Sequence, residues 1–330
     1  MSYLCCLIPQ CCFLKKAFLC FFVMACGISA NAHAESFEIG LIGDLPYHEP
    51  PASWRALWQD LDRAPLDFVV HVGDIKAGNQ PCSDAYFQDI QKDFQASKHP
   101  LFYTPGDNEW TDCIRHNNGH YNPHERLTKL RELFAQGDRS FGQTSLAVQR
   151  QGQDYPENLL WQHRGVTFAA LHIVGSHNNL MRQKEDDDAL WAARQREYQA
   201  RQVANLIWLK QAFDYAKQHQ SPGLMLFIHA NPLFEMRQAK PDNGFRDFLR
   251  ALEDATLAFA QPVVLVHGDS HYFRVDKPLR HRETNQLIAN FTRVEVFGDR
   301  DVHWVRVRVD SSQPQLFFVQ PEMVKANRQH

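Results

Sequence analysis

The sequence has no excess of basic residues, and it lacks several common catalytic motifs. Its formal net charge is -3 and its pI is about 6.6, which argues against a surface that holds nucleic acid through phosphate contacts. It contains no G-x-S-x-G, G-x-x-x-x-G-K-[ST], G-x-G-x-x-G or H-E-x-x-H pattern, so the chemistries tied to those motifs have no support. The chain does have 330 residues, 44% of them hydrophobic and 22% charged, which is enough for a globular fold with a substantial core.

An apolar run near the N-terminus is too short to cross a bilayer. It extends from Ala17 to Ala25, whereas a spanning helix needs roughly 20 apolar residues. Two lysines precede it and a small-x-small site ending at Ala34 follows, which predicts a secretory signal over residues 1–34 and a periplasmic or secreted protein without a transmembrane span. The alternative is a lipid anchor at Cys26, after a lipobox-like stretch. The intact mass of the mature protein distinguishes the two.

Cysteine is scarce beyond this leader. Of the eight cysteines, six lie in the first 34 residues, so only Cys82 and Cys113 remain. Two cysteines in an exported chain predict one disulfide, which would tie two acidic loops together. The alternative is two unrelated thiols.

Three apolar, strand-like runs in the first third of the chain end in the same dipeptide. The Gly-Asp pairs stand at residues 43–44, 73–74 and 106–107. Taken singly, each also fits an ordinary turn, but helical stretches at 52–61 and 83–94 separate the runs and predict parallel βαβ units. The aspartates are 30 and 33 residues apart, about one such unit each. We therefore expect three carboxylates side by side at the carboxyl edge of a sheet.

The rest of the chain continues this α/β pattern. Two apolar strands, 224–229 and 263–271, carry histidines at their ends, whereas His71 lies inside its strand and is interpreted as structural. We expect further helices and strands at 125–134 (helix), 159–161 and 166–174 (strands), 184–218 (largely helical), and 245–259 (helix). The β-rich runs 294–297, 302–309 and 315–319 predict an antiparallel closing portion. Without a low-complexity linker or internal repeat, residues 35–330 are expected to form one domain.

Carboxylates and imidazoles gathered at strand ends suit two divalent cations, because carboxylate oxygens can bridge them and neutral imidazoles complete their shells. The order of motifs resembles that of the calcineurin-like metallophosphoesterases, D-x-H, G-D, G-N-H-[DE], a lone His and G-H-x-H. The resemblance spans roughly residues 38–271. It implies a four-layered α-β-β-α sandwich of mixed sheets, with two metals at the strand ends.

The resemblance also implies a ligand set. Asp44 matches the first-motif ligand, and Asp74 matches the carboxylate that bridges both metals. The matching metal positions are Asp44, Asp74, Asp107, His229, Asp269 and His271.

Four positions depart from the family pattern. Pro46 replaces the first-motif histidine, Asp269 replaces a histidine, and Asp107 replaces an asparagine next to Asn108, which itself stands where the family has its proton-donating histidine. The site gains two carboxylates and loses two imidazoles. Such an oxygen-rich set should favour Mn²⁺ or Mg²⁺, with Fe or Zn as the other candidates.

Two questions of register stay open in the sequence. Asn108 could be a ligand if its loop is shifted by one residue, and His267 could contribute if the last turn differs. Asn108 cannot donate a proton as an acid, so the leaving group must be protonated by water or by a loop histidine such as His116, His120 or His177.

The leading hypothesis is an exported phosphoesterase that uses metal-activated hydroxide to hydrolyse a small phosphomonoester or phosphodiester. The rival is a catalytically weak or inactive envelope protein of the same fold that binds metal or a phosphorylated glycan or lipid. Substrate identity and oligomeric state are not assigned.

Overall fold

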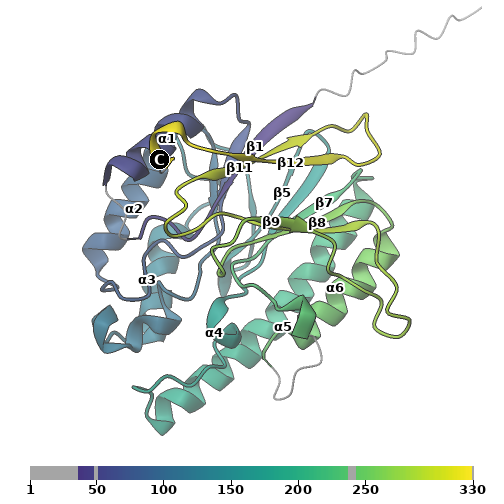
Figure 1. Cartoon of the computed structure of the whole chain (residues 1–330). Helices are drawn as coiled ribbons and strands as arrows, with labels where there is room; N and C mark the ends of the chain where they lie inside the picture. The colour runs from purple at the N-terminus through teal and green to yellow at the C-terminus, as the bar shows by residue number, and fades with distance from the viewer. Residues whose placement is uncertain (1–35, 48–50, 237–242, 329–330) are drawn as a thin grey trace, which may run out of the picture. The chain divides into compact units, whose positions relative to one another are not determined.

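Two β-sheets lie face to face in the computed structural model, which describes residues 36–47, 51–236 and 243–328 (Figure 1). The first sheet has the order β12-β11-β1-β2-β3 and the second the order β4-β5-β6-β7-β8-β10-β9. The first contains β1 (Phe37–Ile42), β2 (Phe68–His71), β3 (Leu101–Tyr103), β11 (Trp304–Val309) and β12 (Phe317–Glu322). The second contains β4 (Gln149–Gln151), β5 (Tyr155–His163), β6 (Val166–Ala170), β7 (Leu224–Phe227), β8 (Val263–His267), β9 (Arg274–Asp276) and β10 (Phe291–Glu295).

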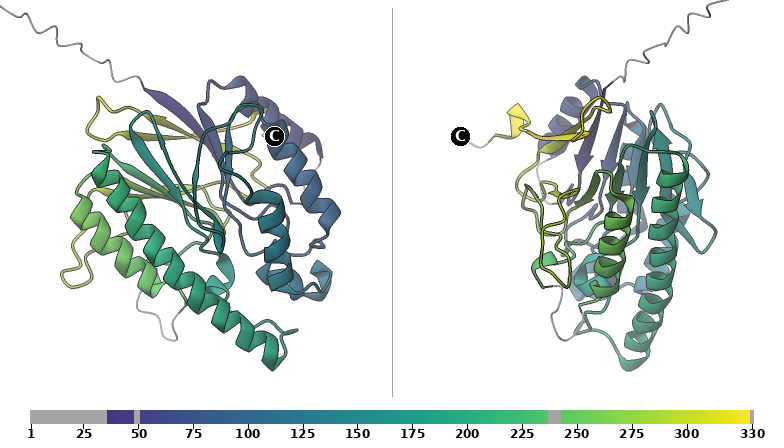
Figure 2. Two further views of the ribbon diagram at one scale, coloured as in Figure 1. Left: turned by 180° about the vertical axis from the view of Figure 1, so that it is seen from behind. Right: turned by 90° about the vertical axis from the view of Figure 1, so that its right-hand side faces the viewer.

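Helices cover the outer face of each sheet (Figure 2). The first sheet is covered by α1 (Pro51–Arg63), α2 (Asp84–Ala96) and α3 (Pro123–Phe134), and the second by α5 (Asp188–Gln218) and α6 (Arg246–Phe259). The layers are therefore helix, sheet, sheet and helix, as expected, and these layers belong to one compact unit. The expected signal over residues 1–34, with Cys26, lies outside the described residues. Among the described helices, none combines the length and the apolar character that a membrane span requires.

The alternation of side chains along the strands explains the four layers. In β7, Met225 and Phe227 point into the core between the sheets, while Leu224 and Leu226 pack under α5 and α6. Both faces of such strands are buried, which is why they read as continuous apolar runs. Aromatic rings join the sheets: the rings of Phe102 and Trp161 stack with centroids 3.9 Å apart.

The closing portion differs from the expectation of antiparallel strands. Strands β11 and β12 are antiparallel to their neighbours, but β10 pairs in parallel with β8. The connection from β8 to β10 is long enough to reverse direction twice, and it places β9 on the outer side of β10. The strand expected over residues 166–174 also ends early, at Ala170.

His71 lies in β2 as a fully buried side chain. Its Nε2 lies 2.7 Å from the carbonyl oxygen of Leu45, and its Nδ1 accepts a hydrogen bond from the N–H of Gly73 at 3.2 Å. Burial lowers the pKa of His71 to about 4, so the folded protein holds this ring neutral at pH values where the unfolded chain would protonate it.

This shift predicts acid lability that can be traced to one residue. The unfolded chain binds the extra proton between the ordinary pKa of 6.5 and about 4, so stability from the neutral ring is complete above pH 6.5 and is lost as the pH falls. We expect the stability advantage of wild type over His71→Phe to shrink by about 1.4 kcal/mol per pH unit in that window. Urea unfolding of both metal-free proteins measures it, and a pH-independent difference would contradict the assignment.

Candidate metal centre

Four of the six predicted ligands stand on short, strained turns after the strands. Asp44 follows β1 and Asp74 follows β2, and their φ angles are 54° and 56°. Asp269 and His271, after β8, have φ angles of 76° and 57°. Residues other than glycine rarely adopt this left-handed conformation, and where they do the strain is concentrated at functional sites.

His229 is the centre of this arrangement. The ring is fully buried, and its Nδ1 lies 2.9 Å from the carbonyl oxygen of Val72, to which it donates. Its Nε2 has no hydrogen-bond partner among the described residues, yet it lies 3.3 Å from Asp74 Oδ1, 3.3 Å from Asp107 Oδ1 and 3.9 Å from Asp269 Oδ1. Without a metal ion these carboxylates favour a proton on the ring, and a cation bound between Nε2 and the carboxylates would take the place of that proton. A backbone carbonyl that fixes the other ring nitrogen is the usual support of a metal-binding histidine.

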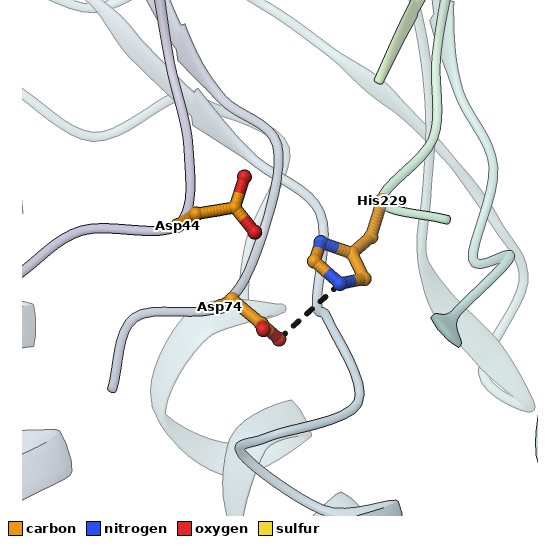
Figure 3. Close-up of side chains that lie close together, drawn as sticks. All are labelled: Asp44, Asp74 and His229. Atoms are coloured by element: carbon orange, nitrogen blue, oxygen red, sulfur yellow. Dashed lines mark ion pairs between the residues drawn. The ribbon is translucent and has the colours of Figure 1, made fainter. Parts of the chain in front are cut away.

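Two groups of side chains converge on this imidazole. One is Asp44, Asp74 and His229, and the other is Asp107, His229 and Asp269; the candidate ligand atoms within each group lie within 4.8 Å of one another. Figure 3 shows the first group, with the Asp74 carboxylate and the ring facing each other. The structure thus brings five of the six predicted ligands into two groups that share His229.

The pKa shifts of the buried side chains at the site favour a bound cation. Burial raises the pKa of Asp44 and of Asp74 well above the ordinary value, and burial also raises the pKa of Asp269, to about 6. Burial alone would lower the pKa of His229, but the carboxylates, Asp74 foremost, raise it well above its ordinary value. Without a cation these acids compete for protons, whereas divalent ions would let them all ionise. The donor set therefore fits divalent metals with oxygen ligands.

His271 lies at the edge of the site, with its side chain 30% exposed, and its Nε2 is 3.5 Å from Asp44 Oδ1. Beside it lies a residue that the motif comparison missed. The hydroxyl of Tyr47 donates to Asp74 Oδ2 at 2.7 Å and lies 3.3 Å from His271 Nε2. In this loop the family motif assigns a ligand only to the position of Pro46. A tyrosine three residues after a strand-ending aspartate was the signal that could have revealed it.

The structure shows which residues of the 107–108 loop and the 267–269 turn face the site. Asp107, not Asn108, faces His229, and the Asn108 amide donates to Asp74 Oδ2 at 2.5 Å and to the Tyr47 oxygen at 3.1 Å. His267 points elsewhere: its Nδ1 lies 2.8 Å from the carbonyl oxygen of Gly268, and its Nε2 is 3.9 Å from Glu295.

The loop histidines proposed as acids are exposed. His116 stacks on His120, with ring centroids 4.9 Å apart. In the described part of the chain, no contact joins the side chain of His116 or His177 to a predicted ligand. The residue before His177 does contact one, because the Ser176 hydroxyl donates to Asp107 Oδ2 at 2.7 Å.

Three glycines make room for the ligands. A Cβ on Gly106 would lie 2.1 Å from Asp74 Oδ1, a Cβ on Gly268 would lie 2.2 Å from Asp44 Oδ2, and a Cβ on Gly175 would lie 2.8 Å from Asp107 Oδ2. Close approach, and not backbone freedom, is what each position requires, since none of the three has a positive φ.

The disulfide between Cys82 and Cys113 is present, as predicted. It joins the loop after Asp74 to the short 3₁₀ helix η1 (Thr111–Ile114), and both sulfurs lie against the carbonyl oxygen of Asn108, at 3.5 and 3.6 Å. Lys76 donates to the same oxygen at 2.8 Å. The bridge therefore fixes the segment that carries Asp107 and Asn108.

Two buried arginines of α5 hold the turn after β6. This turn, α4 (Gly175–Asn178), has left-handed backbone angles at four successive residues, 176–179. Arg194 donates to the side chain of Asn179 at 2.6 Å and to the carbonyl oxygen of Thr111 at 2.7 Å. Arg201 donates to both the side chain and the backbone of Asn178. Helix α5 thus anchors the turn that places Ser176 against Asp107.

Solved structures with similar folds include PhoD (TM-score 0.49, 9% identity, covering 88% of this chain and 69% of that chain). A purple acid phosphatase from yellow lupin (Lupinus luteus) seeds gives a TM-score of 0.45 at 11% identity, covering 87% of this chain and 54% of its own. A 5'-nucleotidase from Candida albicans gives 0.43 at 11% identity, with 88% and 52% covered. No curated protein matches the chain.

The sequence model described as calcineurin-like phosphoesterase matches residues 37–273, which is most of the chain and includes every predicted ligand. Enzymes of that family are metal-dependent phosphoric ester hydrolases. The chain belongs to the calcineurin-like phosphoesterase family.

Proposed function

We propose that the chain is an exported enzyme that hydrolyses a small phosphomonoester or phosphodiester with two divalent ions. One observation carries the proposal: the buried Nε2 of His229 faces three carboxylates without a hydrogen-bond partner among the described residues. A structural histidine in this fold, such as His71, has both ring nitrogens occupied by the backbone. The contrast favours a metal ligand at residue 229.

The ligands divide into a tighter and a looser set. Asp74, Asp107, His229 and Asp269 form the tighter set, and Asp44, Asp74 and His271 the looser one. The buried imidazole with carboxylates 3.3 Å away supports the first set. The partly exposed ring of His271 supports weaker binding at the second set.

The ions would supply Lewis-acid stabilisation of the charge on the phosphoryl group and would lower the pKa of water. The chain's own residues would hold the metal-binding side chains in the orientation that the ions require. Asn108 offers an amide hydrogen-bond donor where the family has an acid, so we assign protonation of the leaving group to water or to His116 or His177.

The proposed ligand atoms determine which metal ions we expect the site to prefer. Carboxylate oxygens outnumber imidazoles, so we expect Mn²⁺ or Mg²⁺ to restore activity to chelator-treated protein better than Zn²⁺ does. The measurement is turnover of an aryl phosphate and a bis-aryl phosphate after addition of each metal, together with metal analysis of the purified protein. Two tightly held zinc ions would contradict this expectation.

A second candidate is a binding protein of the same fold without efficient catalysis. The departures at Pro46 and Asn108 favour it, since they remove one ligand and one acid from the family pattern. The same assay separates the two candidates. Metal binding without turnover of either ester by any of the three metals would support the binding protein.

The proposed location is the periplasm or the exterior of the cell. The signal expected over residues 1–34 supports it. The disulfide between Cys82 and Cys113 also supports it, because disulfides persist in oxidising compartments.

A further inference from the structure

Arg115 lies at the border of the candidate metal centre, with its guanidinium group fixed by two partners. It directly follows η1, and its side chain is 29% exposed. Its Nη2 lies 2.8 Å from Oδ2 of the buried Asp112, and its Nε donates to Gln183 Oε1 at 3.1 Å. Gln183 in turn donates to Asp112 Oδ1 at 3.1 Å. These three side chains form a closed ring of polar contacts, which holds the planar guanidinium in one orientation.

The third nitrogen of this guanidinium has no partner in the fold. Among the described residues, Nη1 of Arg115 makes no hydrogen bond, and it is not buried. Gly78 shows where it lies, because a Cβ on this glycine would be 3.6 Å from Nη1 and 2.9 Å from Asn108 Oδ1. Nη1 and the side chain of Asn108 therefore border the same space, and the two N–H groups of Nη1 can donate to a ligand there.

Two chains of contacts connect the guanidinium to the predicted metal ligands. On one side, the Asn108 amide donates to Asp74 Oδ2 at 2.5 Å. On the other side, the Ser176 hydroxyl lies 3.0 Å from Asp112 Oδ1 and donates to Asp107 Oδ2 at 2.7 Å. The guanidinium is thus separated from Asp74 by one side chain, and it forms no ion pair with that carboxylate among the described residues.

The departing oxygen of a hydrolysed ester needs a proton or a stabilising positive charge. Asn108 stands where the family pattern has its proton-donating histidine, and an amide cannot act as that acid. A guanidinium beside the amide provides the other means, since its positive charge is permanent and its N–H groups can donate to an oxygen on which negative charge develops. Charge stabilisation can therefore replace acid catalysis on this side of the site.

We propose that Arg115 contacts the leaving-group oxygen of the substrate through Nη1 and stabilises the negative charge that develops on it. The inference rests on the proposed phosphoesterase function and gives this chain's own residue a task that the family pattern gives to an acid. In this step the oxygen of a water molecule bonds to phosphorus and its proton passes to solvent. The bond from phosphorus to the leaving oxygen breaks, and that oxygen keeps the electron pair and takes a proton from solvent. Arg115 keeps its own protons.

The dependence of the rate on the leaving group tests this role. Phenolate is a poor leaving group and para-nitrophenolate is a good one, so stabilisation matters most for the first. We expect Arg115→Met to lower kcat/KM for phenyl phosphate by about 10²-fold or more, the usual loss when one donor to an oxyanion is removed, and to lower it for para-nitrophenyl phosphate by less than about 10-fold. Diphenyl phosphate and bis(para-nitrophenyl) phosphate extend the comparison to diesters. A purely structural role would lower the rates of both members of each pair by the same factor.

Arg182→Met is the matched control. Arg182 also pairs with an aspartate, Asp188, at 2.7 Å, and its side chain is 48% exposed. We expect this variant to keep the wild-type ratio of the two rates.

Arg115→Lys is the second test variant, because it keeps a positive charge opposite the buried Asp112 if Arg115→Met fails to fold. An ammonium group held by Asp112 has no second nitrogen to direct at the substrate. The loss that is specific to phenyl phosphate should therefore remain in Arg115→Lys. Circular dichroism and metal analysis of the same samples check the fold and the bound metal.

The outcomes separate this inference from the function on which it rests. A selective loss for phenyl phosphate in a folded, metal-loaded Arg115 variant, with Arg182→Met unchanged, establishes the contact. Equal losses for both esters, no loss, or failure of both Arg115 variants to fold or to hold metal overturns the role of Arg115 and leaves the proposed function in place. Wild type that hydrolyses none of these esters with Mn²⁺, Mg²⁺ or Zn²⁺ overturns both.

Discussion

Asp74→Asn is expected to lower kcat/KM for aryl phosphate hydrolysis by about 10³-fold or more. The proposed function assigns Asp74 to both metals, and the structure places its carboxylate against His229 Nε2, Tyr47 and Asn108 at once. An amide keeps the shape but removes one negative charge from the proposed metal site, and electrostatic stabilisation is usually the largest single contribution to enzyme catalysis. The measurement is steady-state kinetics at saturating Mn²⁺, with bound metal counted in the same samples.

Asp89→Asn is the control for this change. Asp89 lies on α2 with its side chain 72% exposed, in a surface pair with Lys92, and such pairs contribute little. We expect it to match wild type in both rate and metal content. Wild-type turnover by Asp74→Asn would refute the metal-dependent mechanism.

Gly106→Ala is expected to disrupt the site although it removes no ligand. The added Cβ would lie 2.1 Å from Asp74 Oδ1 and 2.5 Å from the backbone nitrogen of Asp74, so the aspartate must move. Overpacking of this kind typically costs about 1–3 kcal/mol of stability. We expect in addition a fall in activity of about 10²-fold or more, because an error of about 1 Å in a positioned group has effects of that size.

Gly223→Ala is the control, because it introduces a similar clash away from the candidate metal centre. Its Cβ would lie 2.3 Å from Leu316 Cδ2. Gly223 directly precedes β7, at the end of the strand away from the candidate ligands. The variant should therefore lose stability and keep its Mn²⁺ affinity. Thermal unfolding and Mn²⁺ titration of both variants make the comparison. If Gly106→Ala bound metal as wild type does, the close packing around Asp74 would not be needed for the site.

The strand ends were predictable from sequence because two signals coincided there. Each buried strand reads as an apolar run, and each run stops at a Gly-Asp or a histidine. The structure places these ends at one edge, so that Asp44, Asp74 and Asp107 come close to His229. Helix α5 was also predicted, but the role of its arginines was not. The sequence pattern of a helix does not distinguish an arginine that is buried and hydrogen-bonded from one that faces solvent.

The parts that sequence did not reveal depend on contacts between distant segments. Whether β10 pairs in parallel or antiparallel is decided by the path of the chain after β8, which no local pattern encodes. The contact of Tyr47 with Asp74 was not predictable, because the family motif assigns a role only to residue 46 in this loop. The left-handed turn at 176–179 has only a weak local signal, in Asn178 and Asn179, since its geometry is held by Arg194 and Arg201 from outside the turn.

Because α5 anchors the turn at 176–179, this part of the candidate site is preorganised before a ligand binds. A turn with four left-handed residues is unfavourable on its own, so its geometry is settled when the chain folds and not when a ligand arrives. The entropy of ordering Ser176 and Asp107 is then absent from the free energy of binding, which leaves more of the contact energy for affinity. A site with this turn should bind its ions and its substrate as a preformed receptor.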